Sequence, residues 1–141
     1  MADTYNLERF VEAQAPVYEQ VLSELRAGRK QSHWIWFIFP QIAGLGYSST
    51  AQFYAIESLD EAAAYLQHPV LGSRLRECTE IVNGIEGRSV NAILGSPDDM
   101  KFRSSMTLFA QATKDNEIFL SALKKYFEGR ADELTLQRIH S

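Results

Sequence analysis

Apolar residues recur every three or four positions along most of the chain, in short runs that glycine, proline and serine separate. Residues 18–25, 70–82 and 117–127 show this spacing most clearly, and it gives a helix one apolar face. No run alternates apolar and polar residues as a half-buried strand does. The pattern predicts an all-α protein in which residues 1–141 form a single compact domain of short helices.

Capping residues predict where several of these helices begin and end. Ser49 and Ser58 are each followed three positions later by Gln or Glu, the spacing of a capping box. Ser96 is expected to be an N-cap, with Pro97 at the first helical position of the next helix. Gly28 is expected to end the helix at residues 18–25 in a left-handed conformation.

The segment WIWFIFP, residues 34–40, has neither a helical nor a strand period. Such an apolar run is either a buried strand or a wholly buried helix. Because no partner strand is evident elsewhere, we predict a central buried helix that Pro40 ends. Large aromatic side chains supply much of the buried area of a small domain, so the other helices are expected to pack around this segment.

Charge and hydropathy restrict the partners of the chain. The 14 Lys and Arg residues are scattered among 18 Asp and Glu residues, and the net charge is −4. Without a basic stripe, long nucleic acids are not expected partners, although a small anionic ligand needs only one or two cations. No segment approaches the ~18 continuous apolar residues of a membrane span, and the N-terminus lacks a signal-peptide pattern. We therefore expect a cytoplasmic protein without a membrane partner; the sequence does not indicate its oligomeric state.

The loop PQIAGLGYSS follows the aromatic segment and is the first candidate binding element. Gly44 and Gly46 permit close approach of the backbone, while Ser48 and the helix start near Gln52 supply backbone N–H groups. With Gln41, this arrangement suits a phosphate or carboxylate. The alternative is that the glycines only turn the chain, since the loop is neither a Walker loop nor a dinucleotide fingerprint.

Lys30 and His33 precede the aromatic run, which begins with Trp34 and Trp36. The two tryptophans point in different directions on either a helix or a strand, so one of them could face a cleft and stack on a ring. Core packing is the alternative for both. His33 is a candidate general base or, alternatively, a hydrogen-bonded structural residue.

The stretch DDMKFRSSMTLFAQ is the second candidate element. Lys101 and Ser105 are four residues apart and share one helix face, and Ser104 adds another hydroxyl. These groups could bind a ligand. Alternatively, the serines permit close helix packing and Lys101 is solvated.

Glu57 and Asp98 are the candidate catalytic carboxylates, although each also has an ordinary role on a helix surface or at a helix N-terminus. The three histidines, at positions 33, 68 and 140, form no zinc motif with other residues. Neither a metal nor a cofactor is predicted.

Four stretches of the chain together resemble a known family. They are ERFVEAQ, ELRAGRKQSHWIWFIFPQIAGLGYS, YAIESLDEAAAYLQHPVLGSRL and DDMKFRSSMTLF, and the resemblance that they carry extends over nearly the whole chain. They resemble the bacterial family catalogued as domain of unknown function 1810, sometimes mislabelled calpastatin. The resemblance implies a mainly helical single-domain fold and confers no activity.

The chain also resembles, more distantly, the helical NADAR family. The resemblance lies in the order of four elements: a glycine turn, the stretch STAQFYAI, an EAAAYL helix and the stretch KFRSSMTLF. That family is linked to NAD and ADP-ribose and includes N-glycosidic hydrolases. The resemblance implies that a catalytic glutamate would stand where this chain has Gln52. An amide cannot act as a general base, so Glu57 or Asp98 would have to supply the carboxylate.

Two functions of different classes fit these features. In the first, the candidate residues form a cleft for a nucleotide-like or ADP-ribose-like ligand, with N-glycosidic hydrolysis as its reaction. Lys101 and loop N–H groups would hold phosphates, Trp34 or Trp36 would stack on a ring, and a carboxylate would activate water. In the second, the chain is a non-catalytic interaction or structural module whose aromatic motif is core packing.

Overall fold

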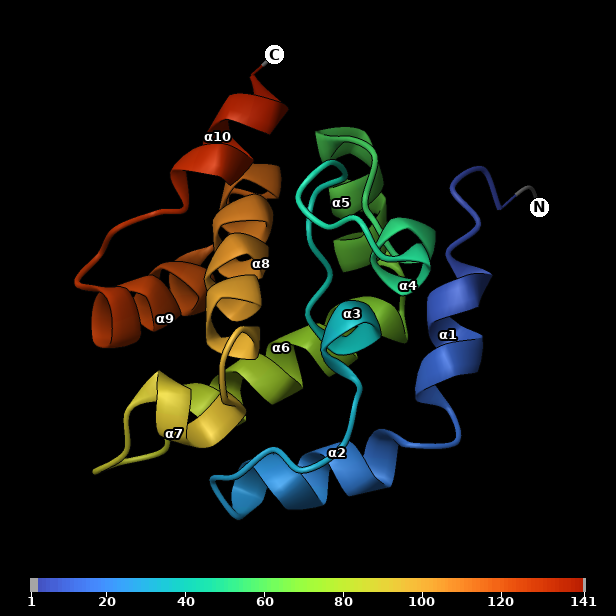
Figure 1. The fold of residues 1–141 in the computed structure, drawn as a ribbon. Coiled ribbons are helices and arrows are strands. Elements are labelled where there is room, and N and C mark those ends of the chain that lie inside the picture. The colour runs from blue at the N-terminus through green and yellow to red at the C-terminus, as the bar shows by residue number, and fades with distance from the viewer. Residues whose placement is uncertain (1–2, 141) are drawn as a thin grey trace.

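The computed structural model describes residues 3–140, which form one helical domain (Figure 1). Its helices are α1 (Glu8–Gln14), α2 (Tyr18–Arg26), α3 (Ile35–Ile38), α4 (Ser49–Phe53), α5 (Leu59–Gln67), α6 (Leu71–Asn83), α7 (Val90–Leu94), α8 (Asp98–Ala112), α9 (Glu117–Phe127) and α10 (Glu133–Ile139). The described residues contain no strand, only one isolated bridge between Ile42 and Ile56. The predicted all-α fold class is confirmed.

Within residues 3–140, no helix is both long and apolar enough to cross a membrane.

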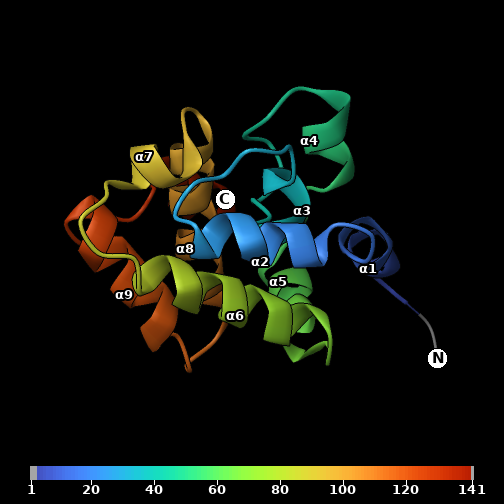
Figure 2. The ribbon, with the colours of Figure 1, turned by 90° about the horizontal axis from the view of Figure 1, so that it is seen from below.

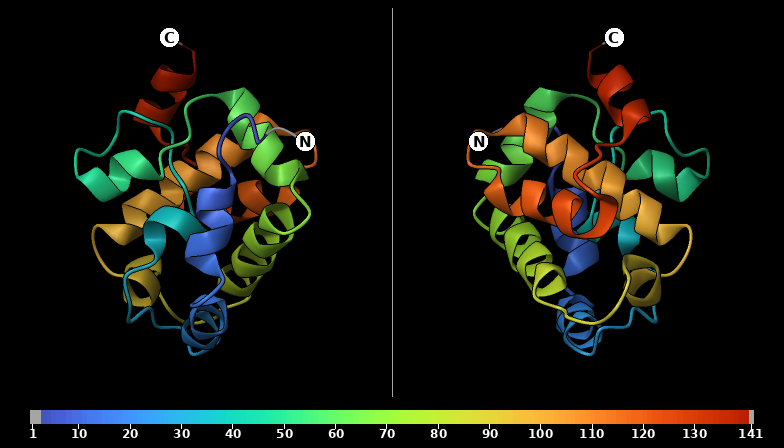
Figure 3. Two further views of the ribbon diagram at one scale, coloured as in Figure 1. Left: turned by 90° about the vertical axis from the view of Figure 1, so that its right-hand side faces the viewer. Right: turned by 90° about the vertical axis from the view of Figure 1, so that its left-hand side faces the viewer.

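Helix α8 is the centre of the fold. It packs against α3, α5, α7, α9 and α10, and Figure 3 shows these elements around it from two sides. Helix α6 packs against α2, α5 and α9, and α2 and α6 lie side by side in Figure 2. Because neighbours surround α8, its buried residues run without interruption from Ser104 to Ala110 and do not form one stripe.

Aromatic rings connect the helices through the core. Phe10 of α1 meets Tyr65 of α5 edge to face at 5.1 Å between ring centroids, and Tyr65 lies 5.3 Å from Phe109 of α8. Phe39 meets Phe102 edge to face at 4.8 Å. Such pairs stabilise a fold by roughly 0.5–1.5 kcal/mol each beyond the area they bury.

Within residues 34–40 only Ile35–Ile38 form the predicted helix, α3, which ends before Pro40, leaves Trp36 and Phe37 half-buried, and contacts α1 and α8. After it, the chain runs out as the loop of residues 41–48 before α4. Ile56 holds the start of this loop, because its N–H donates to the Gln41 carbonyl at 2.9 Å and its carbonyl accepts from Ala43 N–H at 2.8 Å. The loop therefore begins from a fixed position beside the core.

Two predicted helix starts are each wrong by one residue. The N-cap of α4 is Ser48 and not Ser49, since Ser48 Oγ accepts a hydrogen bond from Ala51 N–H at 3.1 Å. Helix α8 begins at Asp98, with Pro97 at the N-cap position and no side-chain cap from Ser96. The predicted cap at Ser58 and the left-handed Gly28, with φ of 73°, are confirmed.

Candidate functional site

The loop of residues 41–48 separates two adjoining cavities, which we call the inner pocket and the outer groove. The inner pocket has a volume of about 340 Å³ and is lined by Trp36, Gln41, Ile42, Ala43, Gly44, Gly46, Ala51, Gln52, Tyr54, Ala55 and Glu57. The outer groove has a volume of about 460 Å³ and is lined by Gln41, Leu45, Gly46, Tyr47, Ser48, Ala51, Pro97, Met100, Lys101, Ser104, Asp132 and Leu134. Both volumes lie in the range of small-molecule sites.

The inner pocket combines a carboxylate, two amides and an aromatic wall. Glu57 is exposed, and its backbone N–H is held by Glu61 Oε1 at 2.9 Å. The Gln52 amide donates to the Tyr47 carbonyl at 3.0 Å, which ties α4 to the loop. Trp36 is half-buried and supplies the largest ring in the lining. Such a lining can accept hydrogen bonds from hydroxyl groups and pack against a planar ring.

Lys101 connects the inner pocket with the outer groove. The lysine lines the groove, while its Nζ lies 4.8 Å from the ring centroid of Trp36 in the inner pocket. The same Nζ is 3.8 Å from Asp98 Oδ1, and Lys30 Nζ is 2.8 Å from Asp98 Oδ2. Asp98 thus lies between two cations and neutralises part of their charge. It lines neither cavity.

Gly46 lies at the border of the two cavities, because Gly46, Gln41 and Ala51 line both of them. A Cβ atom at Gly46 would lie 2.7 Å from the Ala51 Cβ, closer than real Cβ contacts come. The loop can therefore approach α4 this closely only without a side chain at position 46.

The C-terminal helix supports the loop from outside. Arg138 of α10 donates from Nε to the Ala43 carbonyl at 3.1 Å, and a Cβ atom at Gly44 would overlap its guanidinium. Gly44 also has a φ of +98°, which L side chains rarely adopt. The predicted need for glycine at positions 44 and 46 thus has a steric cause at each.

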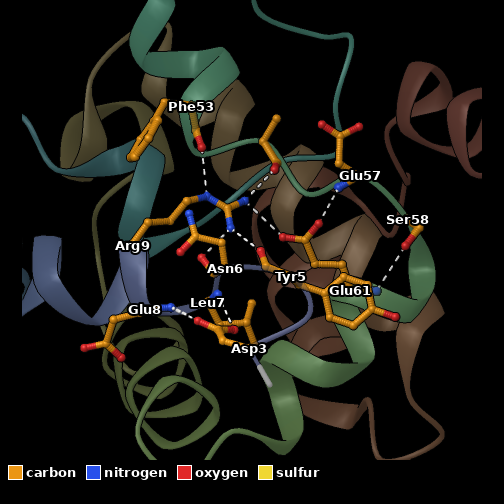
Figure 4. Close-up of polar contacts among 11 residues, drawn as sticks. Asp3, Tyr5, Asn6, Leu7, Glu8, Arg9, Phe53, Glu57, Ser58 and Glu61 are labelled. Carbon is orange, nitrogen blue, oxygen red and sulfur yellow. Dashed lines mark hydrogen bonds and ion pairs between the residues drawn. The ribbon is translucent and has the colours of Figure 1, made fainter. Parts of the chain in front are cut away.

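Arg9 of α1 anchors the segment that forms the far wall of the inner pocket (Figure 4). Its guanidinium makes five hydrogen bonds, which match the five N–H donors that the group possesses. The acceptors are the Phe53 carbonyl at 2.8 Å, the Tyr5 and Asn6 carbonyls at 2.7 Å each, the Ala55 carbonyl at 2.9 Å and Glu61 Oε2 at 3.0 Å. Arg9 thereby fixes residues 53–55 against α1 and α5.

Glu61 completes this network from α5. It is 2% exposed, and while Oε2 pairs with Arg9, Oε1 accepts from Glu57 N–H. The backbone at Glu57 is therefore positioned by a buried ion pair. Asp3 fixes the start of α1 in the same region by accepting from Leu7 and Glu8 N–H, and these hydrogen bonds lower the pKa of Asp3.

Trp34 belongs to a separate buried network around Glu24 of α2. Its ring is 1% exposed, and its Nε1–H donates to Glu24 Oε1 at 2.9 Å. The same carboxylate accepts from Gln31 N–H at 2.8 Å, from Ser32 N–H at 3.1 Å and from the Ser32 hydroxyl. Burial alone would raise the pKa of Glu24, but these hydrogen bonds lower it to about 2.

Acidification is expected to weaken the fold through Glu24. A carboxyl group whose pKa falls from 4.5 to about 2 on folding stabilises the protein above pH 4.5. This stability, at most roughly 3 kcal/mol, is lost as the pH decreases from 4.5 toward 2, because the unfolded chain binds the proton more readily. Urea unfolding at pH 7 and pH 3 measures the loss. Glu24→Gln should reduce the difference between the two pH values, and an unchanged difference would contradict this role.

Of the fourteen predicted site residues, nine line at least one of the two cavities and five line neither. Trp36, Gln41, Gly44, Gly46, Gln52 and Glu57 line the inner pocket, and Gln41, Gly46, Ser48, Lys101 and Ser104 line the outer groove. Lys30, His33, Trp34, Asp98 and Ser105 line neither. Ser105 is fully buried within α8, and its hydroxyl has no hydrogen-bond partner among the described residues. The residues that the sequence did not indicate include Arg9, Tyr47, Ala51, Met100 and Leu134.

Across residues 3–140, no group of three or more His, Cys, Asp or Glu side chains is placed to hold a metal ion.

A family model and a solved structure match the chain. The structure is similar to the crystal structure of the conserved hypothetical protein Rv1873 from Mycobacterium tuberculosis, with 55% sequence identity, 99% of each chain covered and a TM-score of 0.98. No curated protein matches the chain. The model of the family described as protein of unknown function (DUF1810) matches residues 4–139, which confirms the family resemblance read from the sequence. The chain therefore belongs to the DUF1810 family.

Proposed function

We propose that the inner pocket and the adjoining part of the outer groove bind a nucleotide-like or ADP-ribose-like ligand and hydrolyse its N-glycosidic bond. One observation carries the proposal: a pocket with a carboxylate and an indole adjoins a second cavity, and Lys101 of that second cavity lies over the indole. A nucleotide needs a ring surface, hydrogen-bond acceptors for its sugar and a cation for its phosphate. Trp36, Glu57 and Lys101 supply these three features.

In the proposed complex, the ring packs against Trp36 and the phosphate lies next to Lys101. The lysine is pre-positioned by the Trp36 ring at 4.8 Å and by Asp98 at 3.8 Å. Side chains fixed before binding lose less conformational freedom when the ligand arrives. Trp34 does not contact the ligand in this complex, because its ring is buried and its Nε1–H donates a hydrogen bond to Glu24.

Glu57 is the proposed general base. Its carboxylate takes a proton from water, the water oxygen bonds to the anomeric carbon, and the C–N bond breaks as the leaving nitrogen is protonated. Gln52 cannot replace it, since an amide does not accept a proton at neutral pH and its N–H holds the Tyr47 carbonyl. Asp98 is less suited to this role because it lies between Lys30 and Lys101, outside the inner pocket.

The non-catalytic alternative is supported by the burial of the aromatic motif. Trp34, Ile35, Ile38 and Phe39 are all within the core, so most of the motif packs the domain whether or not a ligand binds. Under this alternative, substitution of Lys101 leaves the stability of the fold nearly unchanged and causes no separate binding defect.

Ligand binding is tested by thermal shift with NAD, ADP-ribose, ADP, mononucleotides and nucleosides. We expect a phosphate-containing ligand to raise the Tm, since a ligand at 100 times its Kd stabilises a fold by about 2.7 kcal/mol. Lys101→Ala should weaken that binding by about 10- to 100-fold, because a charge-assisted contact contributes roughly 1.5–3 kcal/mol. Lys124→Ala, an exposed lysine on α9, is the matched control and should bind normally. Equal affinities for both variants would exclude Lys101 from the site, and no shift with any ligand would favour the structural module.

A further inference from the structure

The outer groove has an apolar rim that the proposed function leaves unused. Five large apolar side chains are exposed among the described residues: Tyr47, Phe53, Met100, Leu120 and Leu134. Three of them line this one groove, with exposed fractions of 87% for Tyr47, 45% for Met100 and 60% for Leu134. They come from the loop, α8 and α10, so the fold, and not one amphipathic helix, brings them together.

We infer that the outer groove binds a second ring-bearing group of the same ligand, so that the preferred ligands carry a ring at each end of a phosphate linkage. This inference rests on the proposed function, in which the first ring lies in the inner pocket and the phosphate lies at Lys101.

The two cavities adjoin at the position where such a linkage would cross. Gln41, Gly46 and Ala51 line both cavities, and Gly46 adds no side chain at this border. Lys101 lines the groove while its Nζ lies over Trp36. One cation can therefore contact a linkage whose two ends lie in different cavities.

The chemistry of the groove suits a planar ring better than a second charged group. An aromatic ring, a thioether and an aliphatic side chain all pack favourably on the face or edge of a ring. The acidic side chain in the lining, Asp132, is engaged by α10 and α8: Oδ2 accepts from the Thr135 hydroxyl of α10 at 2.5 Å and from Ser104 Oγ of α8 at 3.1 Å. Lys101 is the cation of the lining, and it lies toward the inner pocket.

Calorimetric titrations with ADP and with diadenosine diphosphate test the inference, because the second compound differs by one additional adenosine on the same diphosphate. Diadenosine diphosphate should bind about tenfold more tightly than ADP, as expected for modest additional burial of apolar area. Leu134→Ser should remove most of this advantage and leave the affinity for ADP unchanged. Leu120→Ser, an exposed leucine on α9 outside both cavities, should change neither affinity.

The outcomes separate the inference from the function on which it rests. If ADP binds but the second adenosine adds no affinity, the inference is wrong and the proposed function stands. If Leu134→Ser weakens ADP as much as diadenosine diphosphate, the groove holds the first ring, which also overturns the inference. If neither compound binds the wild-type protein, the proposed nucleotide site itself is rejected. Urea unfolding of each variant establishes that the fold is intact, and Tyr47→Ser provides a second variant at the opposite side of the groove.

Discussion

Glu57→Gln is expected to abolish most of the N-glycosidic hydrolysis while the ligand still binds. Replacing a general base by its amide typically costs about 10²- to 10⁴-fold in rate, because the amide no longer accepts the proton from water. The side chain is exposed and its backbone N–H bonds to Glu61, so the substitution preserves shape and leaves the fold intact.

Product analysis by chromatography measures the rate, and thermal shift measures binding in the same samples. Glu19→Gln, which changes an exposed glutamate on α2, is the matched control and should hydrolyse at the wild-type rate. If Glu57→Gln retains full activity, another group is the base. If wild-type protein binds nucleotides without cleaving them, the site is a binding site only, and the hydrolytic part of the proposal fails.

Arg9→Ala is expected to destabilise the fold by about 3–5 kcal/mol, the usual cost of removing one partner of a buried ion pair. The substitution leaves Glu61, which is 2% exposed, without its counter-charge, and it leaves the Phe53 and Ala55 carbonyls without their donor. Because these carbonyls belong to the segment that lines the inner pocket, ligand affinity should fall together with stability.

Urea unfolding measures this effect, and Arg130→Ala provides the control. The Arg130–Glu128 pair joins side chains that are 75% and 81% exposed, and such surface pairs contribute about 0–1 kcal/mol. The double variant Arg9→Ala/Glu61→Gln should lose less than the sum of the two single losses, since the neutral amide no longer leaves a buried charge unpaired. Equal destabilisation by Arg9→Ala and Arg130→Ala would show that the network around Arg9 does not stabilise the fold.

The helices were predictable because their signals are local. Periodic apolar positions, the cap at Ser58 and the left-handed Gly28 each depend on residues within one or two turns. Capping at Ser48 in place of Ser49 shows the limit of such signals, because two adjacent serines offer the same hydroxyl and the loop geometry selects between them. Ser105 was placed with Lys101 on one face of α8, but neighbours on several sides of this helix bury the serine and leave the lysine at the cavity.

The candidate site was predicted most completely within one segment, although Glu57 and Lys101 from other segments were also indicated. Gln41, Gly44, Gly46 and Ser48 are close in the sequence and were recognised together. Arg9 was missed because its acceptors at Phe53 and Glu61 are 44 and 52 residues away. Leu134 was missed for a related reason: an exposed leucine on a short helix has no distinguishing pattern, and only the packing of α10 on α8 brings it to the groove.

The unequal burial of the two tryptophans gives the protein two separate optical reporters. Trp34 is enclosed with Glu24 in the core, so its emission is expected to respond to unfolding. Trp36 forms a wall of the inner pocket with the Lys101 ammonium over its ring, so its emission is expected to respond to whatever enters that pocket. Trp34 fluorescence therefore reports unfolding of the core, and Trp36 fluorescence reports ligand binding in the inner pocket. Replacing either tryptophan by phenylalanine isolates the signal of the other.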